Sequence, residues 1–155
     1  MFLFTNFENM PVSRSKSKVC FFFLETRISL DHRAELKKFI ESVFRSHGRR
    51  LGSLNYIFCT DKALLEINRS YLDHNYYTDI ITFDLSGSST IEGEIYISLD
   101  RVKENAKKLQ VSFKSEIHRV IFHGALHLCG LKDKSKEERD RMRKAEDHLL
   151  KKYLP

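Results

Sequence analysis

The sequence predicts an α+β fold, in which a four-stranded mixed sheet packs against about five helices. Segments with the composition of strands occur before residue 99, and the chain from 99 to 153 consists of successive helical patterns, an order typical of this class. The length of 155 residues and the hydrophobic fraction of 41% suit one domain with one core. We therefore expect a single domain over residues 1–155, with residues 1–17, which show no clear period, as a poorly ordered lead-in.

Four segments rich in β-branched and aromatic residues predict the strands of the sheet. They are the segment that begins at Val19 and the segments 51–59, 78–85 and 91–98. The last segment alternates apolar and polar side chains. We therefore expect a half-buried strand there, with one face against the core and the other in solvent.

Five segments repeat apolar residues with the spacing of a helix. Asp31 is a candidate N-cap for the first helix, and the second begins near Asp61 with Tyr71 on its apolar face. The other three helices cover about 99–109, 113–129 and 136–152. Ser135 and Glu138 form a capping-box pattern ahead of the last helix.

The charge and the cysteines indicate the kind of protein and its compartment. A charged fraction of 31% and a net charge of +6 create a field that attracts polyanions such as nucleic acid. The three cysteines form no CxxC pair, which argues against a disulfide framework and a cysteine zinc site. The apolar run 19–24 is too short to cross a bilayer, and no signal-peptide pattern follows it. We therefore expect a cytoplasmic protein without a membrane partner.

The stretch HGALHLCGLKD, residues 123–133, places two histidines four residues apart in an otherwise apolar helix. This spacing stacks His123 and His127 on one ridge, so that their imidazoles converge on one point. Gly130 suits a left-handed helix end, after which the chain can reverse and bring Asp133 toward the histidines. Zinc accepts two imidazoles and a carboxylate, with a further position open to water, and several other divalent transition metals accept the same donors. We predict one Zn²⁺ per chain, bound by these three residues at the central helix.

The pattern HxxxHxxGxxD has the spacing of the metzincin zinc site, HExxHxxGxxH, and predicts a zincin-like domain. Gly124 replaces the glutamate that serves such a protease as general base, and Asp133 replaces the third histidine. The change at Gly124 argues against a metallopeptidase, which stays open as an alternative. A further alternative is that the two histidines are core residues that bind no metal.

Three motifs together resemble the YbeY endoribonucleases, the ribosomal RNA maturation factors of bacteria. They are HGALHLCG with a third ligand six residues after His127, LLEINRSYLDHNYYTDIITFD (64–84) and GEIYIS (93–98). The resemblance covers about residues 51–150. The chain departs from the family pattern at Asp133, where most members have a histidine, and at Leu72, where an arginine thought to help catalysis is common.

The resemblance implies a zinc-dependent, single-strand-specific endoribonuclease that trims the 3′ end of precursor small-subunit (16S) rRNA and takes part in ribosome quality control. By position, it identifies His123 and His127 as metal ligands, with Asp133 in the place of the third. It also implies precursor rRNA, small-subunit ribosomal proteins and an assembly GTPase as partners, and no DNA. A non-catalytic ribosome-assembly factor with a structural metal stays open, because Leu72 stands where the family has arginine.

The side chains that would assist the metal in RNA cleavage are not marked by a motif. A bound metal activates water and polarises a phosphoryl oxygen, and the developing charge needs a cationic group. The nearest candidates in sequence are Lys132 and Lys134, beside the third ligand, and Arg119, one turn before the first histidine. The lysines can equally be part of a solvated loop. Asp79 is expected either to accept a hydrogen bond from a ligand histidine or to cap a turn.

Overall fold

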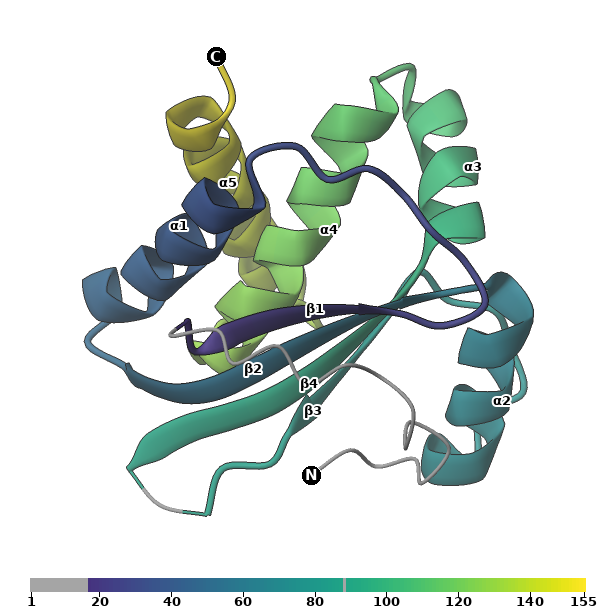
Figure 1. The fold of residues 1–155 in the computed structure, drawn as a ribbon, viewed down its shortest axis with the longest axis horizontal. Coiled ribbons are helices and arrows are strands. Elements are labelled where there is room, and N and C mark those ends of the chain that lie inside the picture. Colours follow the sequence, from purple (N-terminus) through teal and green to yellow (C-terminus); the bar gives the residue numbers. More distant parts are fainter. Residues whose placement is uncertain (1–16, 88) are drawn as a thin grey trace.

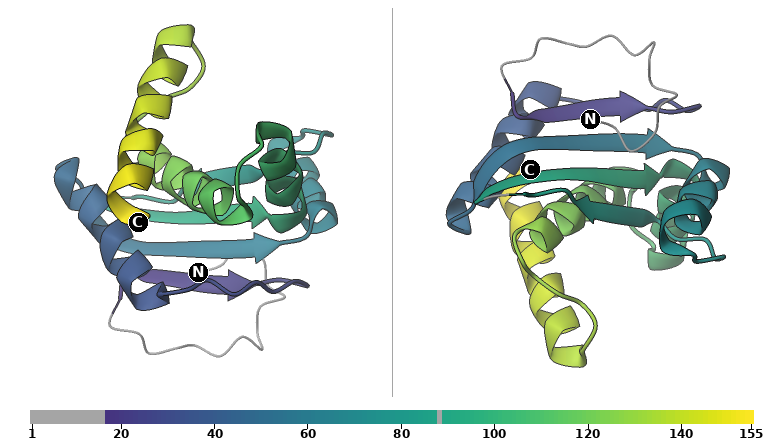
Figure 2. Two further views of the ribbon diagram at one scale, coloured as in Figure 1. Left: turned by 90° about the horizontal axis from the view of Figure 1, so that it is seen from above. Right: turned by 90° about the horizontal axis from the view of Figure 1, so that it is seen from below.

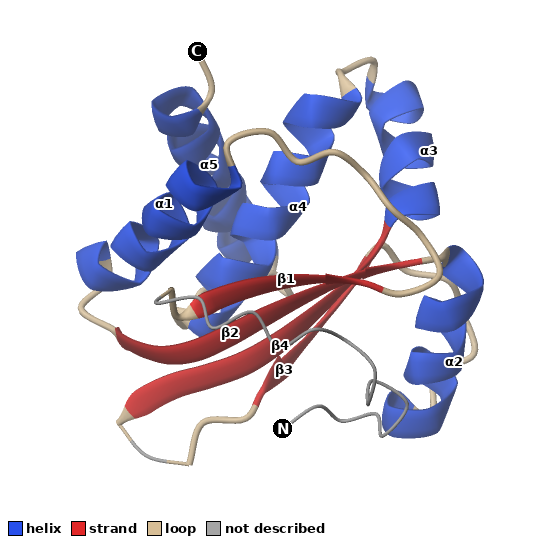
Figure 3. Cartoon of the chain, viewed as in Figure 1, coloured by secondary structure: helices blue, strands red, loops and turns tan. Residues whose placement is uncertain are grey.

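The computed structural model describes residues 17–87 and 89–155, and Figure 1 shows a sheet with helices on both of its faces. Within these residues the order is β1 (Val19–Phe23), α1 (Arg33–Ser46), β2 (Arg50–Cys59), α2 (Asp61–Leu72), β3 (Ile80–Asp84), β4 (Thr90–Ser98), α3 (Leu99–Leu109), α4 (Phe113–Leu128) and α5 (Lys136–Tyr153). The predicted α+β class, with four strands and five helices in this part of the chain, is confirmed (Figure 3). Residues 1–16 of the predicted lead-in lie outside the described residues.

The sheet is mixed, as predicted, with the strand order β1-β2-β4-β3. β1 is parallel to β2, and β2 is parallel to β4, whereas β3 pairs antiparallel with β4. β4 therefore lies inside the sheet, and β3 forms the edge that α4 contacts.

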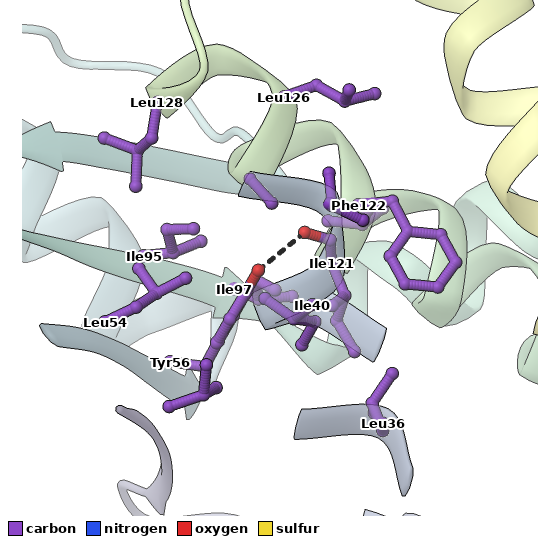
Figure 4. Close-up of a cluster of buried hydrophobic side chains, with 14 of the residues drawn as sticks. Leu36, Ile40, Leu54, Tyr56, Ile95, Ile97, Ile121, Phe122, Leu126 and Leu128 are labelled. Carbon is purple, nitrogen blue, oxygen red and sulfur yellow. Dashed lines mark hydrogen bonds between the residues drawn. The ribbon is translucent and has the colours of Figure 1, made fainter. Parts of the chain in front are cut away.

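The helices cover both faces of the sheet. α1, α3, α4 and α5 lie on one face and α2 on the other (Figures 1 and 2). The larger core lies between the sheet and α1 and α4, where the Tyr56 hydroxyl donates to the Ile121 carbonyl at 2.9 Å (Figure 4). A smaller cluster beneath α2 includes Ile57, Leu64 and Tyr96. The sheet is thus the middle of three layers.

The prediction that β4 has one exposed face is wrong. Every residue from 93 to 98 is buried, because α4 covers one face of this inner strand and α2 the other. Ile95 and Ile97 belong to the larger core and Tyr96 to the smaller one. The Glu94 carboxylate, in a polar position of the alternating pattern, is buried and accepts a hydrogen bond from the Tyr96 hydroxyl at 2.7 Å.

The helix starts were predicted with mixed success. The capping box before α5 is confirmed, since the Ser135 hydroxyl accepts from the Glu138 amide and the Glu138 carboxylate accepts from the Ser135 amide. The prediction that Asp31 caps α1 is wrong. The N-cap is His32, in the left-handed conformation and with no side-chain cap, so the helix starts one position later than a cap at Asp31 requires. Tyr71 of α2 contacts the Phe83 ring but stays 43% exposed.

None of the helices in the described part of the chain has both the length and the apolar composition needed to cross a membrane.

Candidate metal centre

The candidate site lies on α4, which packs closely against the sheet through Gly124. A Cβ atom at this position would lie 2.8 Å from Ile95 Cδ1 and 3.0 Å from Ile80 Cδ1, closer than side chains normally approach. The glycine between the histidines therefore has a packing role. A glutamate, which the metzincin pattern has at this position, would not fit unless the Ile80 and Ile95 side chains or the helix moved.

The turn after α4 brings the third residue of the predicted site to the two histidines. Gly130 has φ +105°, the left-handed conformation predicted for it, and its N–H donates to the His127 carbonyl. The chain then reverses, and Asp133 Oδ2 lies 3.5 Å from His123 Nε2 and 3.3 Å from His127 Nε2. The two Nε2 atoms are 3.0 Å apart. These three residues form a group that could hold a metal ion.

The two histidines are held by their other ring nitrogens. His127 Nδ1 is 2.9 Å from the Leu131 carbonyl oxygen, and His123 Nδ1 is 2.6 Å from Glu146 Oε1. A carbonyl or carboxylate oxygen accepts hydrogen bonds, so in a neutral ring Nδ1 carries the proton and Nε2 presents a lone pair. Burial lowers the pKa of His123, but the hydrogen bond and charge of Glu146, together with the charges of Asp133 and Asp79, raise it, for a net upward shift.

This arrangement fits a bound cation. When both rings are neutral, two lone pairs face each other across 3.0 Å, a repulsive contact that a cation between them would relieve. A tetrahedral site with bonds of about 2.0–2.1 Å has ligand atoms about 3.3 Å apart, close to the separations of 3.0, 3.3 and 3.5 Å found here. The His123, His127 and Asp133 side chains are 21%, 27% and 39% exposed, which leaves room for water or substrate as a further ligand.

Glu146 of α5 is a part of the site that the sequence did not reveal. This residue is 5% exposed, and its carboxylate lies between His123 and the Arg119 guanidinium, whose Nη1 is 3.0 Å from Oε2. Arg119 also pairs with Asp147 at 2.8 Å. The sequence feature that could have revealed Glu146 is its position on α5, one turn after Met142 on the apolar face. A charged side chain buried on such a face needs a partner.

An open cleft of about 620 Å³ faces the three predicted ligands. Lys134 and Asp79 line it, whereas Lys132 lines a separate, smaller pocket beside Arg141. Burial raises the pKa of Asp79, and its Oδ2 accepts from Asn105 at 3.2 Å. The Nδ1 atoms of the two histidines face Glu146 and the Leu131 carbonyl, so Asp79 is not the acceptor for either ring.

Cys129 lies in the larger core, as its position on the helix indicates. It is 6% exposed and is not part of the candidate metal group. Burial raises the pKa of its thiol to about 11, so it stays protonated at neutral pH and is a poor metal ligand.

The fold and the site define an α+β protein with a candidate two-histidine, one-aspartate metal centre that opens into a cleft. Comparison with known families finds a match of residues 24–154 to the family described as Endoribonuclease YbeY. The chain belongs to this family. The resemblance seen in the three sequence motifs is thus confirmed.

Two relatives illustrate the similarity. The chain is 48% identical over 137 residues to an endoribonuclease YbeY of Cytophaga hutchinsonii. The aligned residues make up 87% of this chain and 96% of the relative. It is 50% identical over 113 residues to an endoribonuclease YbeY of Porphyromonas gingivalis, with coverages of 73% and 75%. A solution structure of a Thermotoga maritima protein aligns with a TM-score of 0.59 and 24% identity, covering 87% of this chain and 91% of that chain, which shows a common fold.

Proposed function

We propose that this protein is a zinc-dependent endoribonuclease, with the metal held by His123, His127 and Asp133. The observation that carries the proposal is the convergence of two Nε2 atoms and one carboxylate oxygen at the open cleft, with both Nδ1 atoms already engaged. The names of the relatives supply the reaction class. Two imidazoles and a carboxylate suit zinc, and an open position is typical of catalytic zinc sites.

The chain's own residues have distinct roles in this proposal. A bound metal would supply an activated water and a Lewis acid for a phosphoryl oxygen. Glu146 and the Leu131 carbonyl keep the two imidazoles oriented. Lys134, at the cleft, is the cation best situated to contact the phosphate. Arg119 is engaged with Glu146 and Asp147, so it acts through Glu146 and not on the substrate.

The proposed substrate is single-stranded precursor rRNA of the small subunit, cut near the 3′ end of 16S rRNA in ribosome maturation and quality control. The family membership supports this assignment, and an excess of positive charge, +6, favours a polyanionic substrate. Small-subunit ribosomal proteins and assembly factors are the proposed partners, and the cytoplasm is the compartment in which precursor rRNA is found.

One observation favours a second function, that of a non-catalytic ribosome-assembly factor with a structural metal. Leu72 stands where the family commonly has an arginine, and it lines the cleft with 40% of its surface exposed. An apolar side chain there supplies no charge to a phosphate. In this second function, removal of the metal unfolds the protein and no RNA is cut.

The test measures metal content and RNA cleavage in the same preparations. We expect near-stoichiometric metal in the wild type, lost together with cleavage of single-stranded RNA in His127→Ala and Asp133→Ala. His148→Ala is the matched control, because this histidine is exposed on α5 and is not in the metal group. It should keep both properties.

Each outcome decides a different point. Absence of cleavage by the wild type with zinc, manganese, cobalt or nickel contradicts the nuclease, and metal-dependent folding would then favour the assembly factor. Metal retained in Asp133→Ala shows that Asp133 is not the third ligand. Cleavage that persists in His127→Ala without metal contradicts a metal-dependent reaction.

A further inference from the structure

The loop between α2 and β3 is held in a defined shape by α2. Asn68 is 1% exposed, and its side-chain Nδ2 donates to the Tyr76 carbonyl at 2.9 Å, while its backbone carbonyl accepts from the His74 amide at 3.2 Å. Arg69 Nε donates to Asn75 Oδ1 at 2.6 Å. Two hydrogen bonds to the loop backbone and one to the Asn75 side chain therefore hold the loop, and its aromatic side chains lie at the surface.

Two of these side chains form a stacked, oriented pair at the cleft. The His74 and Tyr76 rings stack, with centroids 5.1 Å apart and an interplanar angle of 23°, and the Tyr76 hydroxyl lies 3.0 Å from His74 Nδ1. Tyr76 is 56% exposed. Both residues line the same cleft as His123, His127 and Asp133.

The neighbouring Tyr77 packs against a guanidinium and lies outside the cleft. It is 54% exposed, nearly as much as Tyr76. Its ring, however, is covered by the Arg101 guanidinium at 5.1 Å, and Arg101 is held by Asp61 at 2.7 Å. Tyr77 is not among the residues that line the cleft. Its ring already packs against Arg101, so it is not a candidate for contact with a ligand in the cleft.

We infer that His74 and Tyr76 form a stacking site for one nucleobase of the RNA whose phosphodiester lies at the metal group. Proteins hold single-stranded nucleic acid by stacking bases on exposed aromatic rings, and the unpaired bases of single strands are free to be splayed out onto them. Rings that are already oriented lose little conformational entropy on binding. The inference rests on the proposed endoribonuclease function, and it explains a preference for single strands, since a base paired in a duplex is not available for stacking.

The test compares Tyr76→Ala with Tyr77→Ala in two assays. Binding of a fluorescent single-stranded RNA oligonucleotide is measured by anisotropy with EDTA present, which prevents metal-dependent cleavage. The enzyme concentration that gives half-maximal single-turnover cleavage is then measured with metal. We expect Tyr76→Ala to raise the dissociation constant for RNA and this half-maximal concentration roughly 5- to 100-fold, with little change in the maximal rate. Tyr77→Ala should stay near the wild type.

A second arm of the same experiment identifies the base. A series of oligonucleotides, each with one abasic position, should show a position where loss of the base weakens binding to the wild type but not to Tyr76→Ala. Thermal unfolding confirms that the variants are folded, and the backbone hydrogen bond from Asn68 is available in all of them.

The two proposals fail in different ways. If the wild type cuts RNA and Tyr76→Ala behaves like Tyr77→Ala, the stacking site is refuted and the nuclease stands. If no RNA is cut but the abasic series gives the expected pattern in binding, the nuclease is refuted and the stacking site stands. Equal weakening by every abasic position, or by none, overturns the stacking site.

Discussion

Replacing Glu146 by glutamine should weaken metal binding at the candidate site while leaving the protein folded. Glu146 Oε1 lies 2.6 Å from His123 Nδ1 and Oε2 lies 3.0 Å from the Arg119 guanidinium, in a side chain that is only 7% exposed. The carboxylate therefore fixes the proton on Nδ1, orients the ring and adds negative charge behind it. Each of these effects makes Nε2 a better metal donor.

The expected loss follows from the kind of hydrogen bond. A hydrogen bond to a charged group contributes about 1.5–3 kcal/mol and a neutral one about 0.5–1.5 kcal/mol. Glutamine keeps an oxygen that can accept from Nδ1 but lacks the charge, so about 1 kcal/mol is lost, or roughly five- to tenfold in affinity. Glu146→Ala removes the acceptor as well and should cost up to about a hundredfold, the upper limit for such partners of metal ligands.

The assay is a competition for zinc between the protein and a chromophoric chelator, with circular dichroism as the check on folding. Asp147→Asn is the matched control, because Asp147 is the next residue and also pairs with Arg119, at 2.8 Å, but does not contact His123. Equal zinc affinities for wild type, Glu146→Gln and Asp147→Asn would refute the reasoning. Equal losses in both variants would assign the effect to Arg119 and not to the histidine.

Three further predictions concern stability. Gly124→Ala should lower the free energy of unfolding measured in urea by about 1 kcal/mol, because overpacking costs about 1–3 kcal/mol and alanine recovers about 1 kcal/mol of helix propensity. A stabilised variant would contradict the close packing against Ile95. Burial lowers the pKa of His118, so the unfolded chain binds its proton first and stability falls as the pH drops below about 6.5, by at most about 1.4 kcal/mol per pH unit. His118→Phe should reduce the loss of stability between about pH 7.5 and 5.5, and an unchanged pH dependence would show that His118 contributes nothing. Ser135→Ala should cost about 1 kcal/mol in thermal or urea unfolding, because the Ser135 hydroxyl no longer caps α5; no change would mean that water replaces the cap.

Much of the fold and of the site was readable from local patterns. The spacing of His123 and His127, the helix end at Gly130 and the capping box at Ser135 each depend on residues within a few positions of one another. Local geometry determines such features, and the structure agrees with each of them. The supposed exposed face of β4 was an error of another kind, since it depends on what packs against the strand, and α2 and α4 both cover it. The wrong cap at Asp31 shows that a local pattern can also fail, because α1 begins one position later than that cap requires.

The sequence by itself determined the element order, the pair of converging histidines and the class of the protein, because helix and strand periodicity and family motifs are properties of contiguous residues. Only the tertiary structure decided that Glu146, 23 positions beyond His123, holds this histidine, and that Arg119 faces carboxylates and not the cleft. It also decided which exposed aromatic residue lines the cleft, Tyr76, and which lies outside it against Arg101, Tyr77. These contacts join segments whose relative placement follows from the packing of all the helices on one sheet, which no local pattern encodes.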